Sequence, residues 1–527
     1  MRIHRPSNGR IRTCAVPGSR TLLAPAVVAL SLICGATAAA APSGAPHTGT
    51  GNGSSTGSAD PTPGSDGVGD PYYPQDGNGG YTAVHYDLGI DYDPPTHHLT
   101  GKATITANAT QDLSAFNLDF AGPPVQGVTV NGKAARFDRQ GEHELVITPA
   151  DPLPNEQSFT VTVDYSGTVA DTGGNGWTYS PSGGAFAAGE PHSATTWYPL
   201  NDTPLNKATV TLHATVPTGW DVASNGIMTS DNPSGTDHHT VTWEDRSPII
   251  GYLTTIAIDK FTHLSQKRSD GTPLESVFAP GAAAQKQELE KKLPQVLDFE
   301  EQLYGPYPFE SGGGIYVDTD LRFSLETQTR PIYAPWTDLN TLIHENAHQW
   351  WGDSMSVTLW KDVCLNECFA SYTADILWPE RIDKQDADQL YLDDLARWEK
   401  RDIWKIPLFD PGKGNEFTTV YTRGALFLHA LRRTIGDDVF FTAVKDFVQD
   451  HKFGNASIPE FRDFIQLRSP EQLGGFFDAW LNGTTRPADE YLFPGSLGDR
   501  HKKNPSPQVN ETPQWPSGQG DRKGAGQ

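Results

Sequence analysis

Cysteine and long apolar runs are the scarcest features of this chain. It holds four cysteines among 527 residues, too few for a scaffold held together by disulfides. The main apolar stretch near the N-terminus, residues 22–33, is shorter than the roughly 20 residues that a bilayer-spanning helix needs, and Pro25 interrupts it. We therefore expect no membrane span, and a chain of this length can bury a sizeable core.

Basic residues are few relative to acidic ones. Lysine and arginine number 40 against 64 aspartates and glutamates, and the formal net charge is −24 at pH 7. A surface of this sign repels phosphate backbones and anionic lipids, which argues against nucleic acid and membrane surfaces as partners. Glycine (52) and proline (41) are plentiful and fit long loops and tails better than a helical bundle.

The first 40 residues have the pattern of a secretory signal. Five arginines lie in the first 20 residues, an apolar stretch follows, and Ala38-x-Ala40 suits a signal peptidase. Cys34 also allows a lipoprotein, which the bulky Ile33 before it disfavours. We predict a signal peptide over residues 1–40 and a secreted, extracellular protein.

Composition and periodicity divide the rest of the chain. Residues 41–79 are rich in Gly, Ser and Pro and predict a flexible linker. From residue 80 apolar and polar residues alternate, and Asn131-Gly132 is a two-residue hairpin signal. The alternation predicts an antiparallel β domain over residues 80–265 with one wetted face. Its clearest example is Phe159, Val161, Val163 and Tyr165.

The period becomes helical after residue 280. We predict an α+β protein whose catalytic domain covers residues 266–492, followed by a disordered polar tail over 493–527. A short strand is expected at 314–317. Helices are expected around Leu289 to Val296 and over 338–351, 361–377, 386–400, 420–434, 437–450, 458–467 and 476–481.

The most informative motif is H-E-x-x-H at His344 to His348. On a helix, residues four apart lie on one face, so both imidazoles can reach one point. Glu367, separated from His348 by eighteen residues, lies on a second expected helix and can supply a carboxylate. Two histidines and a glutamate leave one position of a four-coordinate zinc open, and Glu345 is free to accept a proton from the water there. We predict one zinc per chain.

Other interpretations of these residues stay open at this stage. The pentapeptide alone also fits an amphipathic surface helix with two solvated histidines. After signal removal the remaining cysteines are Cys364 and Cys368, on either side of Glu367. They could form a disulfide, remain two buried free thiols, or act as metal ligands; four residues apart on a helix is a poor spacing for a bridge.

Four ordered segments resemble one enzyme family. His344 to Asp353 and Leu365 to Ala370 look like the metal segments of the gluzincin aminopeptidases, the group of aminopeptidase N and the leukotriene-A hydrolase type. Tyr198 to Pro204 is similar to a segment of the family's β domain. Val420 to Ala425 resembles the segment of its catalytic tyrosine. The similarity runs from about residue 80 to 490.

The resemblance implies a saddle-like β domain followed by a thermolysin-like catalytic domain. Ser324-Leu325-Glu326-Thr327 stands where the family has its exopeptidase motif, so Glu326 is implied to bind the substrate's free amino group. Tyr421 is implied to donate a hydrogen bond to the oxyanion. The helical C-terminal domain of many members is absent from this sequence, which predicts a more open active site.

These observations predict a secreted zinc aminopeptidase that releases N-terminal residues from peptides and acts as a monomer. The catalytic residues are Glu345 and Tyr421, and Glu326 binds a free N-terminus. One alternative is a zinc endopeptidase of the thermolysin type, in which Glu326 has lost its role. Another is a catalytically impaired peptide-binding protein that retains the metal. The presence of Glu345 and of an open zinc position favours chemistry, because a structural zinc site needs neither.

Overall fold

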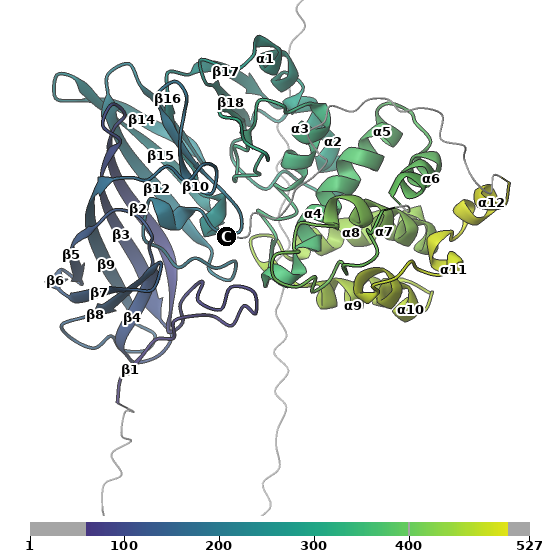
Figure 1. Cartoon of the computed structure of the whole chain (residues 1–527), viewed down its shortest axis with the longest axis horizontal. Coiled ribbons are helices and arrows are strands. Elements are labelled where there is room, and N and C mark those ends of the chain that lie inside the picture. Colours follow the sequence, from purple (N-terminus) through teal and green to yellow (C-terminus); the bar gives the residue numbers. More distant parts are fainter. Residues whose placement is uncertain (1–59, 399–400, 504–527) are drawn as a thin grey trace, which may run out of the picture. The chain divides into compact units, whose positions relative to one another are not determined.

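Antiparallel strands build the first half of the protein in the computed structural model, which describes residues 60–398 and 401–503 (Figure 1). The largest sheet has eight strands, and one neighbouring pair, β12 with β2, runs parallel. In sheet order the strands are β14 (Ile227–Ser234), β15 (His238–Ile249), β12 (Ala208–Pro217), β2 (Tyr81–Asp93), β3 (His98–Ala109), β9 (Ser158–Thr168), β5 (Val125–Val130) and β6 (Lys133–Ala134).

Alternation of buried and exposed side chains explains why these segments form strands. In β9 the apolar positions 159, 161, 163 and 165 are all buried, while the residues between them face outward. The hairpin signal is confirmed: Val130 pairs with Lys133, and Asn131 and Gly132 both have positive φ angles, as a two-residue turn of this kind requires.

Two four-stranded sheets complete the β domain. One has the order β1-β4-β8-β7 and the other β10-β11-β16-β13. Their strands are β1 (Thr62–Pro63), β4 (Leu113–Asp119), β7 (Arg136–Gln140), β8 (Glu144–Thr148), β10 (Gly176–Tyr179), β11 (Ala185–Ala188), β13 (Asp221–Ser224) and β16 (Ile256–Asp259).

A small mixed sheet leads into the helical part. Its order is β17 (Thr262–Lys267), β18 (Pro273–Phe278), β19 (Ile315–Tyr316) and β20 (Ile332–Tyr333). Since β17 pairs along its length with β18, the expected boundary at residue 265 falls inside a strand of this sheet. The short β21 (Ser356–Val357) pairs with β22 (Asn455–Ala456).

Helices follow in the predicted order, but the helix expected around Leu289 to Val296 is two helices, α1 and α2, separated by residues 291 and 292. They are α1 (Ala284–Glu290), α2 (Leu293–Tyr304), α3 (Leu339–Ala347), α4 (Cys364–Tyr372), α5 (Trp378–Arg381), α6 (Ala387–Trp398), α7 (Val420–Ile435), α8 (Asp437–Asp450), α9 (Ile458–Arg468), α10 (Gly474–Phe477), α11 (Asp489–Leu492) and α12 (Ser496–Lys503). Shorter helical turns lie at Ala194–Thr196, Gly251–Leu253, Trp360–Asp362, Thr373–Leu377 and Asp478–Asn482. The fold is therefore α+β, with a β-rich domain before a helical domain.

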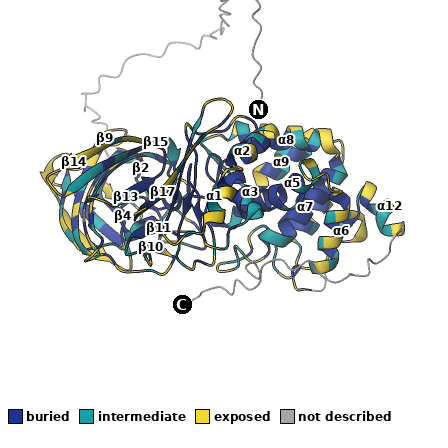
Figure 2. Cartoon of the chain, turned by 90° about the horizontal axis from the view of Figure 1, so that it is seen from above, coloured by how far each residue is buried: buried dark blue, intermediate teal, exposed yellow. Residues whose placement is uncertain are grey.

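Each domain has its own hydrophobic core. One cluster of buried side chains belongs mainly to the β sheets and the other mainly to the helices. Figure 2 shows α7 as largely buried, whereas α12 carries exposed residues; α7 supplies twelve buried residues to its core. This central helix is well placed to support a site at its N-terminal end.

Two expected boundaries differ from the structure. Part of the expected linker is packed: Tyr72 and Asn78 are 5% and 1% exposed, and the Tyr72 hydroxyl donates to Asp410. At the other end, α12 continues the fold into the expected tail and buries Leu497. Both segments are mostly polar and contain few buried residues, so their hydrophobic periodicity is weak. For this reason the composition did not predict that they are packed. The predicted signal peptide and residues 504–527 lie outside the described residues.

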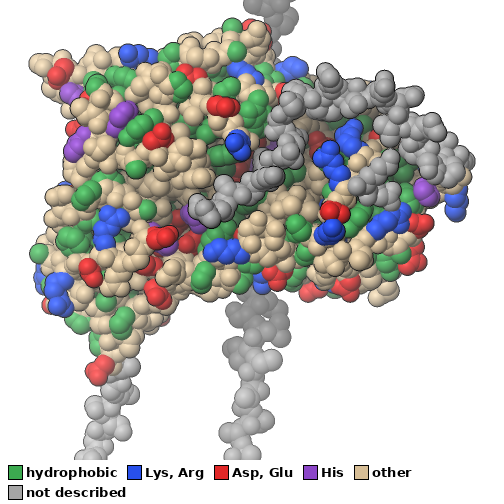
Figure 3. Space-filling view, viewed as in Figure 1, with side chains coloured by type: hydrophobic (Ala, Val, Ile, Leu, Met, Phe, Trp, Pro, Cys, Tyr) green, Lys and Arg blue, Asp and Glu red, His purple; other side chains and the backbone are tan. Residues whose placement is uncertain are grey.

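Charged side chains of both signs lie on the surface. On the face shown in Figure 3, lysine and arginine side chains are scattered among acidic ones. Within the described ranges, the helices are too short or too polar to cross a membrane.

Candidate metal centre

Helix α3 carries both histidines of the H-E-x-x-H motif. The helix begins after Asp338, whose side chain accepts a hydrogen bond from the backbone N–H of Thr341 at 3.0 Å. His344 lies within the last turn and His348 caps the C-terminus. Their ring centroids are 4.9 Å apart, so the four-residue spacing places both imidazoles on one side of the helix.

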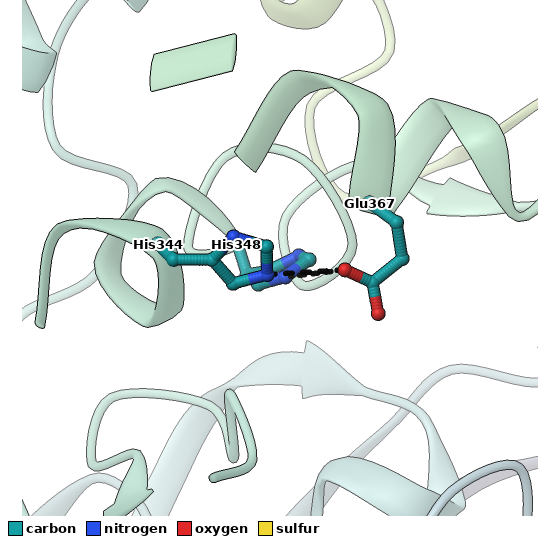
Figure 4. Close-up of side chains that lie close together, drawn as sticks. All are labelled: His344, His348 and Glu367. Atoms are coloured by element: carbon teal, nitrogen blue, oxygen red, sulfur yellow. Dashed lines mark hydrogen bonds and ion pairs between the residues drawn. The ribbon is translucent and has the colours of Figure 1, made fainter. Parts of the chain in front are cut away.

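Glu367 reaches these imidazoles from the neighbouring helix α4. One carboxylate oxygen, Oε2, lies 3.1 Å from His344 Nε2 and 3.5 Å from His348 Nε2. Figure 4 shows both rings turned toward this carboxylate. The structure thus brings together the three residues that the sequence predicted as metal ligands.

The three donor atoms fit a zinc ion in chemistry and in spacing. Zinc binds imidazole nitrogen and carboxylate oxygen at about 2.0–2.2 Å, so neighbouring donors of a tetrahedral site lie roughly 3.3 Å apart. The observed separations of 3.1 and 3.5 Å bracket that value. Three protein ligands also leave one position for water or substrate, which is the arrangement of a catalytic site.

A hydrogen bond orients His348. Its Nδ1–H donates to the backbone carbonyl of Trp351 at 2.9 Å, which leaves Nε2 as the ligand atom. The indole of Trp351 stacks on Phe369 with 3.6 Å between centroids. Trp350 and Trp351 are both at most 1% exposed, so this pair packs in the core.

Burial and charge act in opposite directions on the ligands. Burial by itself raises the pKa of Glu367, but the hydrogen bonds with His344 and His348 hold that pKa well below its usual range. Burial lowers the pKa of His348, while Glu326 and Glu367 raise it by a larger amount. The pocket therefore favours an ionised carboxylate.

Two further glutamates face the same centre. Glu345 and Glu326 are 6% and 3% exposed, and each has a carboxylate oxygen within 4.8 Å of a His348 ring nitrogen. Glu345 comes from α3, whereas Glu326 follows Leu325, whose backbone bridges to Ile332. Burial raises the pKa of Glu326, and the neighbouring His348 opposes this shift.

Tyr421 stands at the first turn of α7. Its hydroxyl donates to Oε1 of Glu367 at 2.7 Å, the carboxylate oxygen that does not face the histidines. The tyrosine therefore lies at the edge of the metal centre, where the resemblance placed it. It is also close enough to affect the third ligand directly.

Sequence reasoning missed two residues at the site. The Tyr252 hydroxyl donates to Oε1 of Glu326 at 2.8 Å, although the two residues are 74 positions apart. The Gln349 amide donates to the backbone carbonyl of Glu326 at 3.3 Å. Gln349 follows the motif directly, and this adjacency was the one available hint. Both residues hold Glu326 in place.

The two cysteines beside Glu367 form a disulfide. Cys364 and Cys368 are bonded and are at most 1% exposed, so the first of the three alternatives is the one observed. The spacing on a helix had argued against it. Cys368 also lies against Gly424 of α7, which links the Glu367 helix to the Tyr421 helix.

Two imidazoles from one helix, a carboxylate from the next and an uncoordinated glutamate beside them define the H-E-x-x-H class of metallopeptidase. Comparison with known proteins agrees. The peptidase M1 N-terminal domain matches residues 82–253, and the peptidase family M1 domain matches residues 323–480. The chain belongs to peptidase family M1.

Relatives in this family are distant. Glutamyl aminopeptidase of Rattus norvegicus is 22% identical over 449 residues, which cover 76% of this chain and 47% of the relative. Aminopeptidase N of Acetobacter pasteurianus is 27% identical over 322 residues, or 55% of this chain and 88% of that protein. The chain thus spans about half the length of the glutamyl aminopeptidases that it matches.

A solved structure matches almost from end to end. The M1 zinc metallopeptidase of Deinococcus radiodurans superposes with a TM-score of 0.74 at 27% identity, covering 80% of this chain and 98% of that one. A point mutant of the same protein was solved with a Tyr-Ser-Ala substrate. The β domain and helical domain described above are therefore the two domains of a two-domain M1 metallopeptidase.

Proposed function

We propose that this protein is a zinc-dependent aminopeptidase that removes N-terminal residues from peptides. The observation that carries the proposal is the pairing of a metal centre with a buried carboxylate, Glu326, a few ångströms from His348. Named relatives support the substrate class, because they are aminopeptidases and a solved neighbour holds a tripeptide.

The ligands of the ion are His344, His348 and Glu367. A zinc ion held by such a set supplies a Lewis acid that makes water more acidic and polarises a carbonyl group. The residues of the chain do the remaining work. His348 is fixed by the Trp351 carbonyl, and Glu367 is fixed by the Tyr421 hydroxyl.

Glu345 acts as the general base. It belongs to the same helix turn as the ligands and has a carboxylate oxygen within 4.8 Å of a His348 ring nitrogen, but it is not one of the three converging donors. A carboxylate in this position takes a proton from the attacking water and delivers it to the leaving amine, a role worth typically 10²–10⁴-fold.

Glu326 binds the free ammonium group of the substrate. In the part of the chain that the structure describes, no lysine or arginine pairs with this carboxylate, and its oxygen accepts from the neutral Tyr252 hydroxyl. A buried carboxylate that has no lysine or arginine partner favours a cationic ligand, and a substrate ammonium is such a ligand. A blocked amino terminus cannot do so, which gives exopeptidase specificity.

Tyr421 stabilises the developing oxyanion. Its hydroxyl hydrogen-bonds to Glu367 at 2.7 Å and so lies at the coordination sphere. Turning this donor from the carboxylate to the substrate oxygen places it where negative charge appears. The residue thus has one partner before the reaction and another during it.

We also propose that the protein is secreted. Support comes from the first 40 residues, in which a basic stretch, an apolar stretch and Ala38-x-Ala40 follow one another. Detection of the processed protein in culture medium, with its N-terminus sequenced near residue 41, tests this. An intracellular product with an intact N-terminus contradicts it.

The test of function compares free and N-acetylated aminoacyl p-nitroanilides. The parent should cleave the free amides only, and a chelator should abolish the activity. In Glu326→Gln the kcat/KM on free amides should fall about 10–100-fold, the range expected for one charge-assisted hydrogen bond. Glu310→Gln, at an exposed glutamate, is the matched control. Equal rates on free and acetylated substrates would support the endopeptidase alternative instead.

A further inference from the structure

A second group of potential metal ligands lies in the β domain. Asp119 ends β4 and Glu144 begins β8, and the two are direct partners across the antiparallel pair. His143 precedes Glu144. One ligand atom of each of these three residues lies within 4.8 Å of the other two. None of the three belongs to the H-E-x-x-H site or touches its ligands.

The carboxylates of this group are buried and incompletely bonded. Asp119 is 0% exposed; its Oδ2 accepts from Asn78 Nδ2 at 3.0 Å and from the Asp202 backbone N–H at 2.7 Å. Among the described residues, no hydrogen-bond donor reaches Asp119 Oδ1. Glu144 is 6% exposed, and the Asn117 side chain hydrogen-bonds to its carboxylate. Each buried acceptor left unpaired costs about 1–3 kcal/mol.

Negative charge is concentrated here. Asp76 and Asp202 stand beside Asp119 and Glu144, and across residues 60–398 and 401–503 no lysine or arginine forms an ion pair with any of the four. The nearest basic side chains are histidines. His143 Nε2 lies 3.6 Å from Asp119 Oδ1 and 3.7 Å from Asp76 Oδ1, and His192 Nδ1 lies 2.8 Å from Asp76 Oδ2.

The pKa values of Asp119 and Glu144 reflect the same excess of negative charge. Burial, followed by the charge of Asp202, raises the pKa of Asp119 well above its usual range. Burial raises the pKa of Glu144 to about 7. Like charges directly opposite on neighbouring strands destabilise a sheet. The pair is therefore unfavourable as two bare carboxylates, and a bound cation removes the conflict.

We propose that Asp119, His143 and Glu144 bind a divalent transition-metal cation, Mn²⁺ or Zn²⁺, that stabilises the β domain. Carboxylates are shared by many divalent ions, but an imidazole nitrogen suits Mn²⁺ or Zn²⁺ better than Ca²⁺, which takes oxygen ligands. His143 Nε2 donates a hydrogen bond to the backbone carbonyl of Gln75 at 3.1 Å, so a metal ion that binds this nitrogen replaces its proton, and the carbonyl offers one more oxygen at the same place.

The position of the site indicates a structural role. Asn78, in segment 70–80, and Asp202, in segment 200–206, both donate hydrogen bonds to Asp119. Lys207 directly follows segment 200–206. The Lys207 ammonium donates to the backbone carbonyls of Asp353 and Ser354, just beyond the H-E-x-x-H helix. A cation at Asp119 would fix the positions of these two segments relative to β4.

Metal binding in a full-length His344→Ala/His348→Ala variant tests the proposal, because this variant lacks the first site. Calorimetric titration with Mn²⁺ and with Zn²⁺ should still give one equivalent per chain, and Ca²⁺ should bind more weakly. Adding Glu144→Gln should weaken binding at least about tenfold. Glu142→Gln, an exposed glutamate two residues away, should leave binding unchanged.

Two results would overturn the proposal. One is a folded His344→Ala/His348→Ala variant that binds neither Mn²⁺ nor Zn²⁺. The other is binding that persists unchanged in both Asp119→Asn and Glu144→Gln. If these buried substitutions prevent folding, His143→Ala replaces them, since its side chain is 22% exposed. The melting temperature of the double variant should rise with Mn²⁺, and His143→Ala should abolish that rise.

Discussion

At the scale of single residues, Glu345 separates metal binding from catalysis. It shares α3 with both histidines but is not among the converging donors. We expect Glu345→Gln to retain one zinc per chain and to lose turnover by about 10²–10⁴-fold, because an amide cannot take a proton from water. Zinc content by mass spectrometry and kcat on an aminoacyl anilide check this, with Glu310→Gln as control. Turnover close to that of the parent would remove Glu345 from the mechanism.

Tyr421 has two roles that a single substitution can separate. Its hydroxyl donates to Glu367, and in our proposal it also donates to the oxyanion. We expect Tyr421→Phe to lower kcat about 10²–10³-fold, the range for one oxyanion donor, with a smaller change in KM. Zinc content must be measured in parallel. Tyr491→Phe is a control at a tyrosine remote from the motif, and parent-like kinetics in Tyr421→Phe would refute the assignment.

At the scale of elements, close packing of α4 on α7 sets the distance between Glu367 and Tyr421. A Cβ atom at Gly424 would lie 2.4 Å from Cys368 Sγ and 2.9 Å from Cys368 Cα. The sulfur cannot swing away, because it is bonded to Cys364. The glycine is therefore required by the contact between the helices.

We expect Gly424→Ala to force the two helices apart. Overpacking of this kind costs about 1–3 kcal/mol of stability, and kcat should fall because both helices carry site residues. Thermal unfolding and kinetics measure the two effects. Gly474→Ala is the control, because a Cβ there meets nothing within 4 Å. Unchanged stability and activity in Gly424→Ala would show that this contact does not position the site.

At the scale of the whole molecule, buried carboxyl groups make stability depend on pH. Glu290 is fully buried at the end of α1, and the hydroxyls of Ser276 and Tyr316 donate to it. Burial raises its pKa from the ordinary value of 4.5 to about 7. The folded state thus holds this proton more tightly than the unfolded chain, so the contribution to stability is lost as pH rises from about 5 through 7.

We expect Glu290→Gln to flatten this dependence. The free energy of unfolding of the parent should fall between pH 5 and 7, and this group accounts for up to about 1 kcal/mol per pH unit of the slope. Urea titrations at pH 5, 6, 7 and 8 measure it. Glu288→Gln, on the exposed side of the same helix, should keep the parent slope. An equal slope in Glu290→Gln would mean that the carboxyl is ionised throughout.

The sequence by itself determined the local pattern and the chemistry of the ligands. Periodicity predicted the β and helical parts, including α8 over the same residues, because each element repeats its burial pattern within a few residues. The H-E-x-x-H spacing likewise placed His344 and His348 on one helix face. Both are short-range consequences of backbone geometry.

Tertiary structure decided what depends on residues far apart in the chain. It brought Glu367 next to the two histidines and allowed Tyr252 to hydrogen-bond to Glu326, 74 positions away in the chain. It also placed Asp119 beside His143 and Glu144. These contacts arise when separate elements pack on one another, and no local repeat in the sequence encodes that packing.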